Sequence, residues 1–204
     1  MVNGGYAYGY LHVAQNPHAE ASFKTIIETH RPSKLLEIGS LHGGLAMMLR
    51  DILDAAGLEQ TPIKTYDINE QDFLKPLIKK HDLNIEAVTE NLFSSDYKDW
   101  KNDKAKQETQ EFIATGNPCL VICDGGCKKC EFNLISDMLK PGDVIMAHDY
   151  APNRDYFEKN VQGILWDWLE IEDQDIEEAC SRNNLSPYMQ EIAQKAVWAC
   201  RIKN

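Results

Sequence analysis

Short apolar runs alternate with amphipathic stretches along most of this chain. Seven runs have the length and residue types of β-strands, at 34–38, 63–66, 85–88, 119–123, 144–147, 168–171 and 196–202. Apolar residues at helical spacing predict helices at 19–30, 45–53, 72–81, 99–115, 130–140, 155–166 and 173–182. Strands that alternate with helices are typical of a sheet whose strands run parallel.

The alternation predicts an α/β fold, a Rossmann-like three-layer sandwich in which helices cover both faces of a seven-stranded, mostly parallel sheet. The run at 119–123 is apolar throughout, as expected of a strand buried on both faces. We expect residues 33–204 to form this domain, preceded by an N-terminal segment and first helix at 1–32. Residues 1–18 are rich in glycine, tyrosine, asparagine and proline and are expected to be irregular.

Composition narrows the classes of protein to which this chain can belong. Hydrophobic residues make up 43% and charged residues 26%, which is ordinary for a globular protein and excludes collagen-like or disordered chains. The formal net charge of −11 repels phosphate backbones and anionic lipid, so we expect neither a nucleic-acid nor a membrane partner. No apolar run is long enough to span a membrane, and residues 1–10 lack a signal-peptide pattern. A cytoplasmic protein with six reduced cysteines is therefore expected.

Glycines and carboxylates are concentrated directly after five of the predicted strands. They lie at 37–44, 67, 90–91, 124–126 and 148–150. Ligands of open parallel sheets bind beyond the carboxyl ends of the strands, so we expect these residues to form one site.

The turn after the strand at 34–38 carries Gly39, Gly43 and Gly44. Glycines let a backbone turn tightly and let a ligand approach main-chain N–H groups at the start of a helix. Gly39 and Gly44 match the first and third glycines of the dinucleotide-binding fingerprint, but Leu41 stands at the second, where a side chain hinders a pyrophosphate. A tight turn without a ligand is the alternative.

Two polar residues suit the recognition of a nucleoside. Asp67 ends its strand, where a carboxylate can accept hydrogen bonds from both ribose hydroxyls. Asn91 follows the next strand and would then lie beside the adenine. The alternatives are a helix cap for Asp67 and a plain loop residue for Asn91.

Together these residues resemble the class I S-adenosylmethionine-dependent methyltransferases. The segment Leu-Leu-Glu37-Ile-Gly39-Ser-Leu-His-Gly43-Gly is similar to their first motif, and Tyr-Asp67 is similar to their ribose-binding strand end. The resemblance covers residues 33–203 and implies that the closing strand is antiparallel. It also implies S-adenosylmethionine as the cofactor, bound by Glu37, Gly39, Ser40, Gly43, Asp67, Asn91 and Asp124.

Within that class, two segments resemble small-molecule O-methyltransferases of the catechol, macrocin and cephalosporin-hydroxylase-like groups. They are Val-Ile-Cys-Asp124-Gly-Gly and Ala-His148-Asp149-Tyr. In those enzymes carboxylates after the fourth and fifth strands hold a magnesium ion. The resemblance implies Asp124, His148 and Asp149 as metal ligands, with Asp124 and His148 catalytic. Relatives often carry a histidine where this chain has Cys127.

The expected reaction is methyl transfer to a hydroxyl of a small molecule or sugar. The hydroxyl must lose its proton and point at the methyl group, and a divalent cation promotes both. Magnesium prefers oxygen ligands such as Asp124 and Asp149, whereas His148 suits manganese or iron or acts as a base. Helix capping and loop hydrogen bonds are the alternative for both carboxylates. Similar enzymes are often dimers or larger, so a homo-oligomer is expected.

Three cysteines support a different hypothesis. Cys123, Cys127 and Cys130 have the C-x3-C-x2-C spacing of radical S-adenosylmethionine enzymes, which hold an iron–sulfur cluster. Cys123 lies inside an apolar strand and the chain is too short for the usual barrel, which disfavours this hypothesis. Because a fold does not determine a function, the same pattern also allows an NAD-dependent oxidoreductase, an iron-dependent hydroxylase of the cephalosporin type or a non-catalytic binding protein.

Aromatic residues and one lysine are the remaining candidates. Trp166 and Trp168 can shape an acceptor pocket, although core packing is the commoner role. Lys128 is expected to be an exposed residue at the start of a helix rather than a base. A lid over the cofactor, as N-terminal segments form in similar enzymes, would consist of Tyr6, Tyr8, Tyr10, His12 and His18, and a terminus without fixed structure is the alternative.

Overall fold

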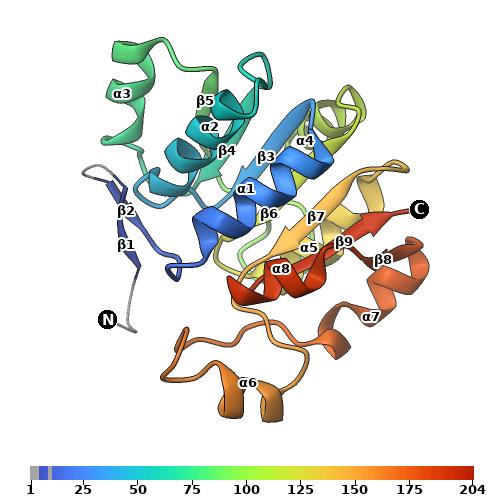
Figure 1. The fold of residues 1–204 in the computed structure, drawn as a ribbon. Coiled ribbons are helices and arrows are strands. Elements are labelled where there is room, and N and C mark those ends of the chain that lie inside the picture. The colour runs from blue at the N-terminus through green and yellow to red at the C-terminus, as the bar shows by residue number, and fades with distance from the viewer. Residues whose placement is uncertain (1–4, 9–10) are drawn as a thin grey trace.

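The structure of the chain is a computed structural model that describes residues 5–8 and 11–204. Within these residues, seven strands form one sheet in the order β5-β4-β3-β6-β7-β9-β8. Helices cover both faces of the sheet, so the molecule is a three-layer α/β sandwich (Figure 1). The Rossmann-like architecture predicted from the sequence is confirmed.

The main sheet is parallel except at its closing strand. Its strands are β3 (Lys34–Ile38), β4 (Ile63–Asp67), β5 (Ile85–Thr89), β6 (Cys119–Cys123), β7 (Val144–Ala147), β8 (Leu185–Pro187) and β9 (Ala199–Lys203). The strands from β3 to β7 pair in parallel, whereas β9 runs antiparallel to both of its neighbours, β7 and β8. The expected antiparallel strand is therefore confirmed.

Successive residues of each strand pack on opposite faces of the sheet, because side chains alternate along a strand. Leu35 and Leu120 pack with α1, α2 and α8 on one face, and Leu36 and Val121 pack with α4, α5 and α7 on the other. The helices are α1 (Ala19–His30), α2 (Gly44–Ala55), α3 (Leu74–His81), α4 (Asp103–Ala114), α5 (Lys128–Ile135), α6 (Arg154–Asn160), α7 (Asp173–Arg182) and α8 (Gln190–Lys195), with a 3-10 turn at Ser136–Met138.

The N-terminal segment forms strands where the sequence predicts irregular backbone. β1 (Tyr6–Tyr8) and β2 (Leu11–Val13) pair antiparallel, and Leu11 and Val13 are buried while His12 is exposed. A methyl group on Gly44 would lie 2.3 Å from the carbonyl oxygen of His12, so this hairpin packs directly on the start of α2. The expectation is wrong because pairing between two short strands, not the composition of either one, forms the structure. Tyr10 lies outside the described residues.

The predicted strand at 168–171 is wrong, and another segment takes its place in the sheet. Trp168 is 51% exposed, and the only pairing there is an isolated bridge between Tyr150 and Ile171 among the described residues. The seventh strand is instead β8 (Leu185–Pro187), which pairs with β9. Three residues that include a serine and a proline carry no alternating pattern, so pairing with β9 decides this strand.

Several predicted helices are shorter in the structure. The helix predicted at 155–166 is α6 and ends at Asn160, because the backbone then turns through Gly163, whose φ is +69°. The helix predicted at 130–140 begins earlier, at Lys128, and changes to a 3-10 turn after Ile135. The helix predicted at 99–115 begins only at Asp103, where Asn102 caps the N–H of Ala105.

The order of the strands places a crevice between β3 and β6. From β3 the chain continues to β4 and β5 on one side and then crosses over to β6 and β7 on the other side. Ligands of such sheets bind beyond the carboxyl ends of the strands where the order reverses. Separately, no helix among the described residues combines the length and the apolar character needed to cross a bilayer.

Candidate active site

Two neighbouring cavities lie at the carboxyl ends of β3, β4, β5 and β6. The first is the smaller and is lined by Asn91 and Tyr97, among others. The second is larger and reaches Asp124 and His148. Gly39, Asp67, Ile68, Gly125 and Gly126 line both cavities. A ligand with two ends, such as a nucleoside joined to an amino acid, matches this arrangement.

Gly39 is required where β3 and β6 end side by side. Its φ is +91°, and a methyl group on it would lie 2.3 Å from the carbonyl oxygen of Asp124 and 2.6 Å from the Cα of Gly125. Gly43 has a φ of +80° and lies against Leu74. The glycines thus let the first turn approach the Asp124 strand end, as close backbone packing demands.

Ser40 and Leu41 occupy the same turn with opposite exposure. Ser40 is buried, and its hydroxyl has no hydrogen-bond partner among the described residues. Leu41 is 50% exposed and lies in the left-handed region, with a φ of +49°. Its N–H donates to the Asp67 carboxylate at 2.8 Å. The turn therefore presents a free hydroxyl and an apolar side chain near the cavities.

Asp67 and Asn91 lie in the positions that the sequence predicts, and both also hold their own loops. Asp67 Oδ2 accepts from Leu41 N–H and Oδ1 from Asn69 N–H, each at 2.8 Å. Asn91 Oδ1 accepts from Phe93 N–H at 3.0 Å. A carboxylate oxygen can accept a second hydrogen bond, so these contacts leave capacity for a ligand.

Glu37 is fully buried inside the sheet, just before the glycine turn. The Thr65 hydroxyl donates a hydrogen bond to its Oε2, while Oε1 has no partner among the described residues. Burial raises the pKa of Glu37 from 4.5 to about 8, although the hydrogen bond from Thr65 lowers it. The residue is therefore protonated at neutral pH in the absence of a ligand.

We expect Glu37 to make the protein less stable as the pH rises. Between pH 4.5 and about 8 the unfolded chain loses this proton while the folded chain keeps it, so the free energy of unfolding falls. Glu37→Gln keeps an acceptor for Thr65 but cannot ionise. As the pH rises over this range, the free energy of unfolding of the variant should increase by at least about 1 kcal/mol relative to that of the wild-type. Urea unfolding followed by circular dichroism measures this difference. Parallel stability curves for the two proteins would contradict this expectation.

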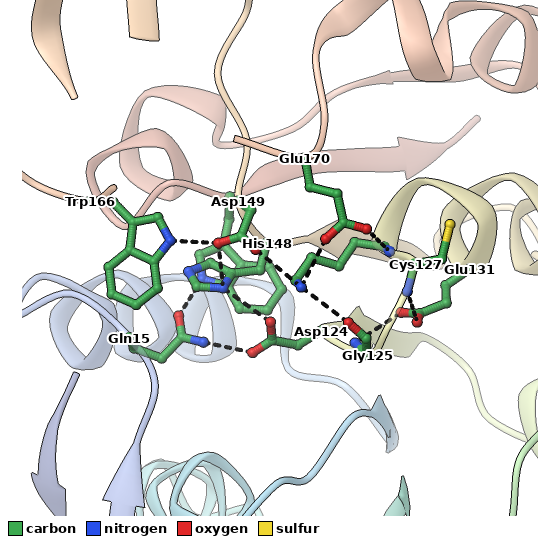
Figure 2. A network of polar contacts seen from close by, with 11 residues as sticks. Gln15, Asp124, Gly125, Cys127, Glu131, His148, Asp149, Trp166 and Glu170 are labelled. Atoms are coloured by element: carbon green, nitrogen blue, oxygen red, sulfur yellow. Dashed lines mark hydrogen bonds and ion pairs between the residues drawn. The ribbon is translucent and has the colours of Figure 1, made fainter. Parts of the chain in front are cut away.

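His148 and Asp124 form the centre of a polar cluster (Figure 2). His148 Nδ1 lies 3.0 Å from Asp124 Oδ1 and 3.4 Å from Asp149 Oδ1. Its ring stacks on Trp198 with a centroid distance of 4.7 Å. Its Nε2 is buried and has no hydrogen-bond partner among the described residues. The structure thus brings the predicted Asp124, His148 and Asp149 together on β6 and β7.

Asp149 is held in an unusual backbone conformation directly after β7. Its φ is +57°, a region that residues with side chains seldom adopt. Trp166 Nε1 donates to its Oδ1 at 2.5 Å, and Lys128 Nζ lies 3.1 Å from its Oδ2. This conformation turns the carboxylate toward the cluster.

Lys128 is not the exposed lysine that the sequence predicts. Only 12% of its side chain is exposed, and its ammonium donates to Glu170 Oε2 at 3.0 Å and to the carbonyl oxygen of Gly125 at 3.1 Å. Burial by itself lowers its pKa, but the nearby carboxylates of Asp149, Asp124 and Glu170 outweigh burial and raise it. Lys128 therefore stays protonated and does not serve as a base.

Sequence reasoning missed Gln15 and Glu131. Gln15 donates from Nε2 to Asp124 Oδ2 at 2.7 Å and accepts from Trp198 Nε1 at 2.9 Å, and no local pattern marks it. The buried Glu131 accepts at 3.1 Å from the N–H groups of Gly125 and Cys127. A glutamate in the first turn of a helix is a recognisable capping signal, so this residue could have been found. Burial raises the pKa of Glu131 to about 7.

The cysteines differ from the expectation of six free thiols. Cys127 and Cys130 form a disulfide, whereas Cys123 is fully buried in β6 within the core. The spacing of these two cysteines at the start of α5 brings their sulfurs within bonding reach. Cys127 and Cys130 are bonded to each other and Cys123 packs in the apolar core, so the three are not free thiolates as a cluster site requires.

The carboxylates do not fit a divalent ion as they are arranged. Each oxygen of Asp124 and Asp149 already lies next to a nitrogen atom. The four nitrogens belong to Gln15, His148, Trp166 and Lys128. No group of three or more His, Cys, Asp or Glu is placed to hold a metal in the part of the chain that the structure describes. The magnesium ion expected from the sequence stays a prediction. The methyl transfer proposed for this site does not depend on it.

Comparison with known proteins bears on the fold. No protein-family model and no curated protein matches this chain. Among solved structures, CmcI in its apo form is 15% identical, with a TM-score of 0.67 over 97% of this chain and 76% of CmcI. CmcI with Mg and S-adenosylmethionine gives 16% identity and a TM-score of 0.63 over 98% of this chain and 76% of CmcI. The chain has the fold of S-adenosylmethionine-dependent methyltransferases.

A further structure with this methyltransferase fold supports the comparison. A protein from Staphylococcus aureus, described as a caffeoyl-CoA O-methyltransferase, is 12% identical, with a TM-score of 0.55 over 91% of this chain and 83% of that protein. Sequence identities this low establish the fold only, because one fold serves many functions. The reaction has to be argued from the site.

Proposed function

We propose that the protein is an S-adenosylmethionine-dependent methyltransferase that acts on a hydroxyl of a small molecule or sugar. The observation that carries the proposal is the pair of joined cavities at the switch point of a methyltransferase-type sheet. Gly39 and Asp67 line both, Asn91 lies in one, and the Asp124–His148 cluster lies in the other. A cofactor with a nucleoside end and a reactive end suits this pair.

The cofactor would lie along the ends of β3, β4 and β5. Its ribose would face Asp67, and its adenine would occupy the smaller cavity beside Asn91. The methionine end would lie over the turn that contains Gly39, Ser40 and Gly43, where the buried Ser40 hydroxyl has no partner among the described residues. Glu37 lies fully buried behind this turn, and its Oε1 has no partner among the described residues.

The acceptor hydroxyl would be deprotonated by His148. With its proton on Nδ1, which lies 3.0 Å from Asp124 Oδ1, the imidazole would have its lone pair on Nε2, which has no partner among the described residues. S-adenosylmethionine, when bound, would supply the methyl group, and its carbon–sulfur bond would break with the electron pair staying on sulfur, which becomes uncharged. The proton of the acceptor hydroxyl would pass to His148 Nε2. General base catalysis of this kind contributes about 100- to 10,000-fold.

The rim of the larger cavity favours an acceptor with an apolar face. Leu41, Ile68 and Trp168 line it, and they are 50%, 62% and 51% exposed. Large exposed apolar side chains around a polar centre are typical of ligand sites. A phenol, or the C–H face of a sugar, would cover these side chains while its hydroxyl reaches His148.

Binding of the product nucleoside tests this function directly. We expect S-adenosylhomocysteine to bind with measurable heat and to raise the melting temperature, whereas NAD at the same concentration does neither. Stabilisation by NAD alone would instead support an oxidoreductase. If neither S-adenosylhomocysteine nor NAD gives heat of binding, the proposal is refuted. Binding of S-adenosylhomocysteine without turnover of any phenol or sugar would favour a non-catalytic binding protein.

A further inference from the structure

The ammonium of Lys128 lies inside the carboxylate cluster and contacts three oxygen atoms there. It has three N–H donors, and three oxygens surround it, from Asp149 at 3.1 Å, Glu170 at 3.0 Å and the Gly125 carbonyl at 3.1 Å. Its side chain is 12% exposed. A cation bound by carboxylate and carbonyl oxygens is thus already built into the chain.

The main chain holds this lysine in place as well. Lys128 is the first residue of α5, and its backbone N–H donates to Glu170 Oε1 at 2.7 Å. Glu170 therefore binds both the backbone and the side chain of the same residue. The first N–H groups of a helix have no partner within the helix, so this contact also caps α5. Both contacts restrict the positions that the ammonium can reach.

The remaining oxygens of the two predicted metal ligands are occupied too. Gln15 and His148 contact the two oxygens of Asp124, and Trp166 contacts the other oxygen of Asp149. Magnesium requires close oxygen ligands in octahedral geometry. An ion would compete with these donors for the same oxygens and would approach the positive charge of Lys128.

We propose that the ammonium of Lys128 takes the place of a divalent cation, so that this site binds no metal ion and works without one. The inference rests on the proposed function for the reaction that the site carries out. The statement that the site binds no metal ion rests on the contacts of Lys128 alone. Lys128 is a positioning residue, because its ammonium contacts Asp149, Glu170 and the carbonyl oxygen of Gly125 and so holds these three groups together. The acceptor hydroxyl then depends on His148 rather than on a metal for its activation.

Titration with Mn²⁺, followed by electron paramagnetic resonance of the free ion, tests the proposal on the protein without nucleotide. We expect the wild-type to bind no Mn²⁺ at this site at millimolar concentration. Lys128→Ala leaves the carboxylates without their cation. This variant should bind one Mn²⁺ with a dissociation constant at least about tenfold below the highest concentration at which the wild-type binds none. Lys129→Ala is the matched control, because the neighbouring lysine is 49% exposed and pairs with Asp175 on the surface. It should behave as the wild-type.

Two results would overturn the proposal. The first is binding of Mn²⁺ by the wild-type that Asp149→Ala abolishes. The second is a folded Lys128→Ala protein that binds no more Mn²⁺ than Lys129→Ala. Lys128→Gln, which keeps most of the side-chain volume, replaces the alanine variant if that variant does not fold, and the wild-type titration needs no variant at all. A parallel titration with S-adenosylhomocysteine separates failure of this proposal from failure of the proposed function.

Discussion

Replacing Asp67 with alanine should weaken the binding of S-adenosylhomocysteine by about 100-fold. The carboxylate ends β4 and lines both cavities, where it would accept hydrogen bonds from the ribose hydroxyls. Hydrogen bonds to a charged group contribute about 1.5–3 kcal/mol each, so loss of the pair has a large effect. Isothermal titration calorimetry measures the change.

Two further variants separate the ribose contact from the loop contacts of Asp67. Asp67→Asn keeps an oxygen for the N–H of Leu41 or Asn69 and should lose only about tenfold in affinity. Asp155→Ala removes a carboxylate that is 74% exposed and pairs with Lys159 on α6, so it should bind as the wild-type does. Unchanged affinity of Asp67→Ala would mean that this carboxylate only holds its loop.

Gly39→Ala should destabilise the protein by at least about 3 kcal/mol and abolish nucleoside binding. The new methyl group would lie 2.3 Å from the carbonyl oxygen of Asp124, so the ends of β3 and β6 must separate. The φ of +91° adds backbone strain. Urea unfolding followed by circular dichroism measures the loss, and calorimetry measures the binding.

Gly142 provides a matched control for the backbone strain alone. Its φ is +90°, nearly that of Gly39, but no atom lies within 4 Å of the added methyl group. Gly142→Ala should therefore lose only about 1–2 kcal/mol and bind the nucleoside normally. Equal losses in the two variants would show that the approach of Asp124 to Gly39 is not what requires the glycine.

Much of the site was accessible from the sequence because its residues follow buried strands. A run such as 119–123 is recognised from its own residues, and the position after it is then known to lie at the carboxyl edge of the sheet. Asp67, Asn91, Asp124 and His148 were located in this way. The prediction failed for β8, whose three residues have no pattern and form a strand only beside β9.

The roles within the site were harder to predict, because they depend on contacts between distant segments. Gln15 reaches Asp124 across 109 positions of the chain, and Lys128 reaches Glu170 across 42. Nothing near Lys128 in the sequence distinguishes a surface lysine from a buried counter-ion. The magnesium expectation rests on the resemblance and on Asp124, His148 and Asp149, and it places Lys128 on the surface rather than beside them.

The sequence by itself determined the layers, the parallel strands and the edge where glycines and carboxylates gather. These depend on alternation and spacing within short segments, which are properties of local sequence. Only the tertiary structure decided which charges meet at that edge. The neighbours of Lys128 come from the loops after β6 and β7 and from the segment between α6 and α7, and burial among them makes its charge a fixed part of the site.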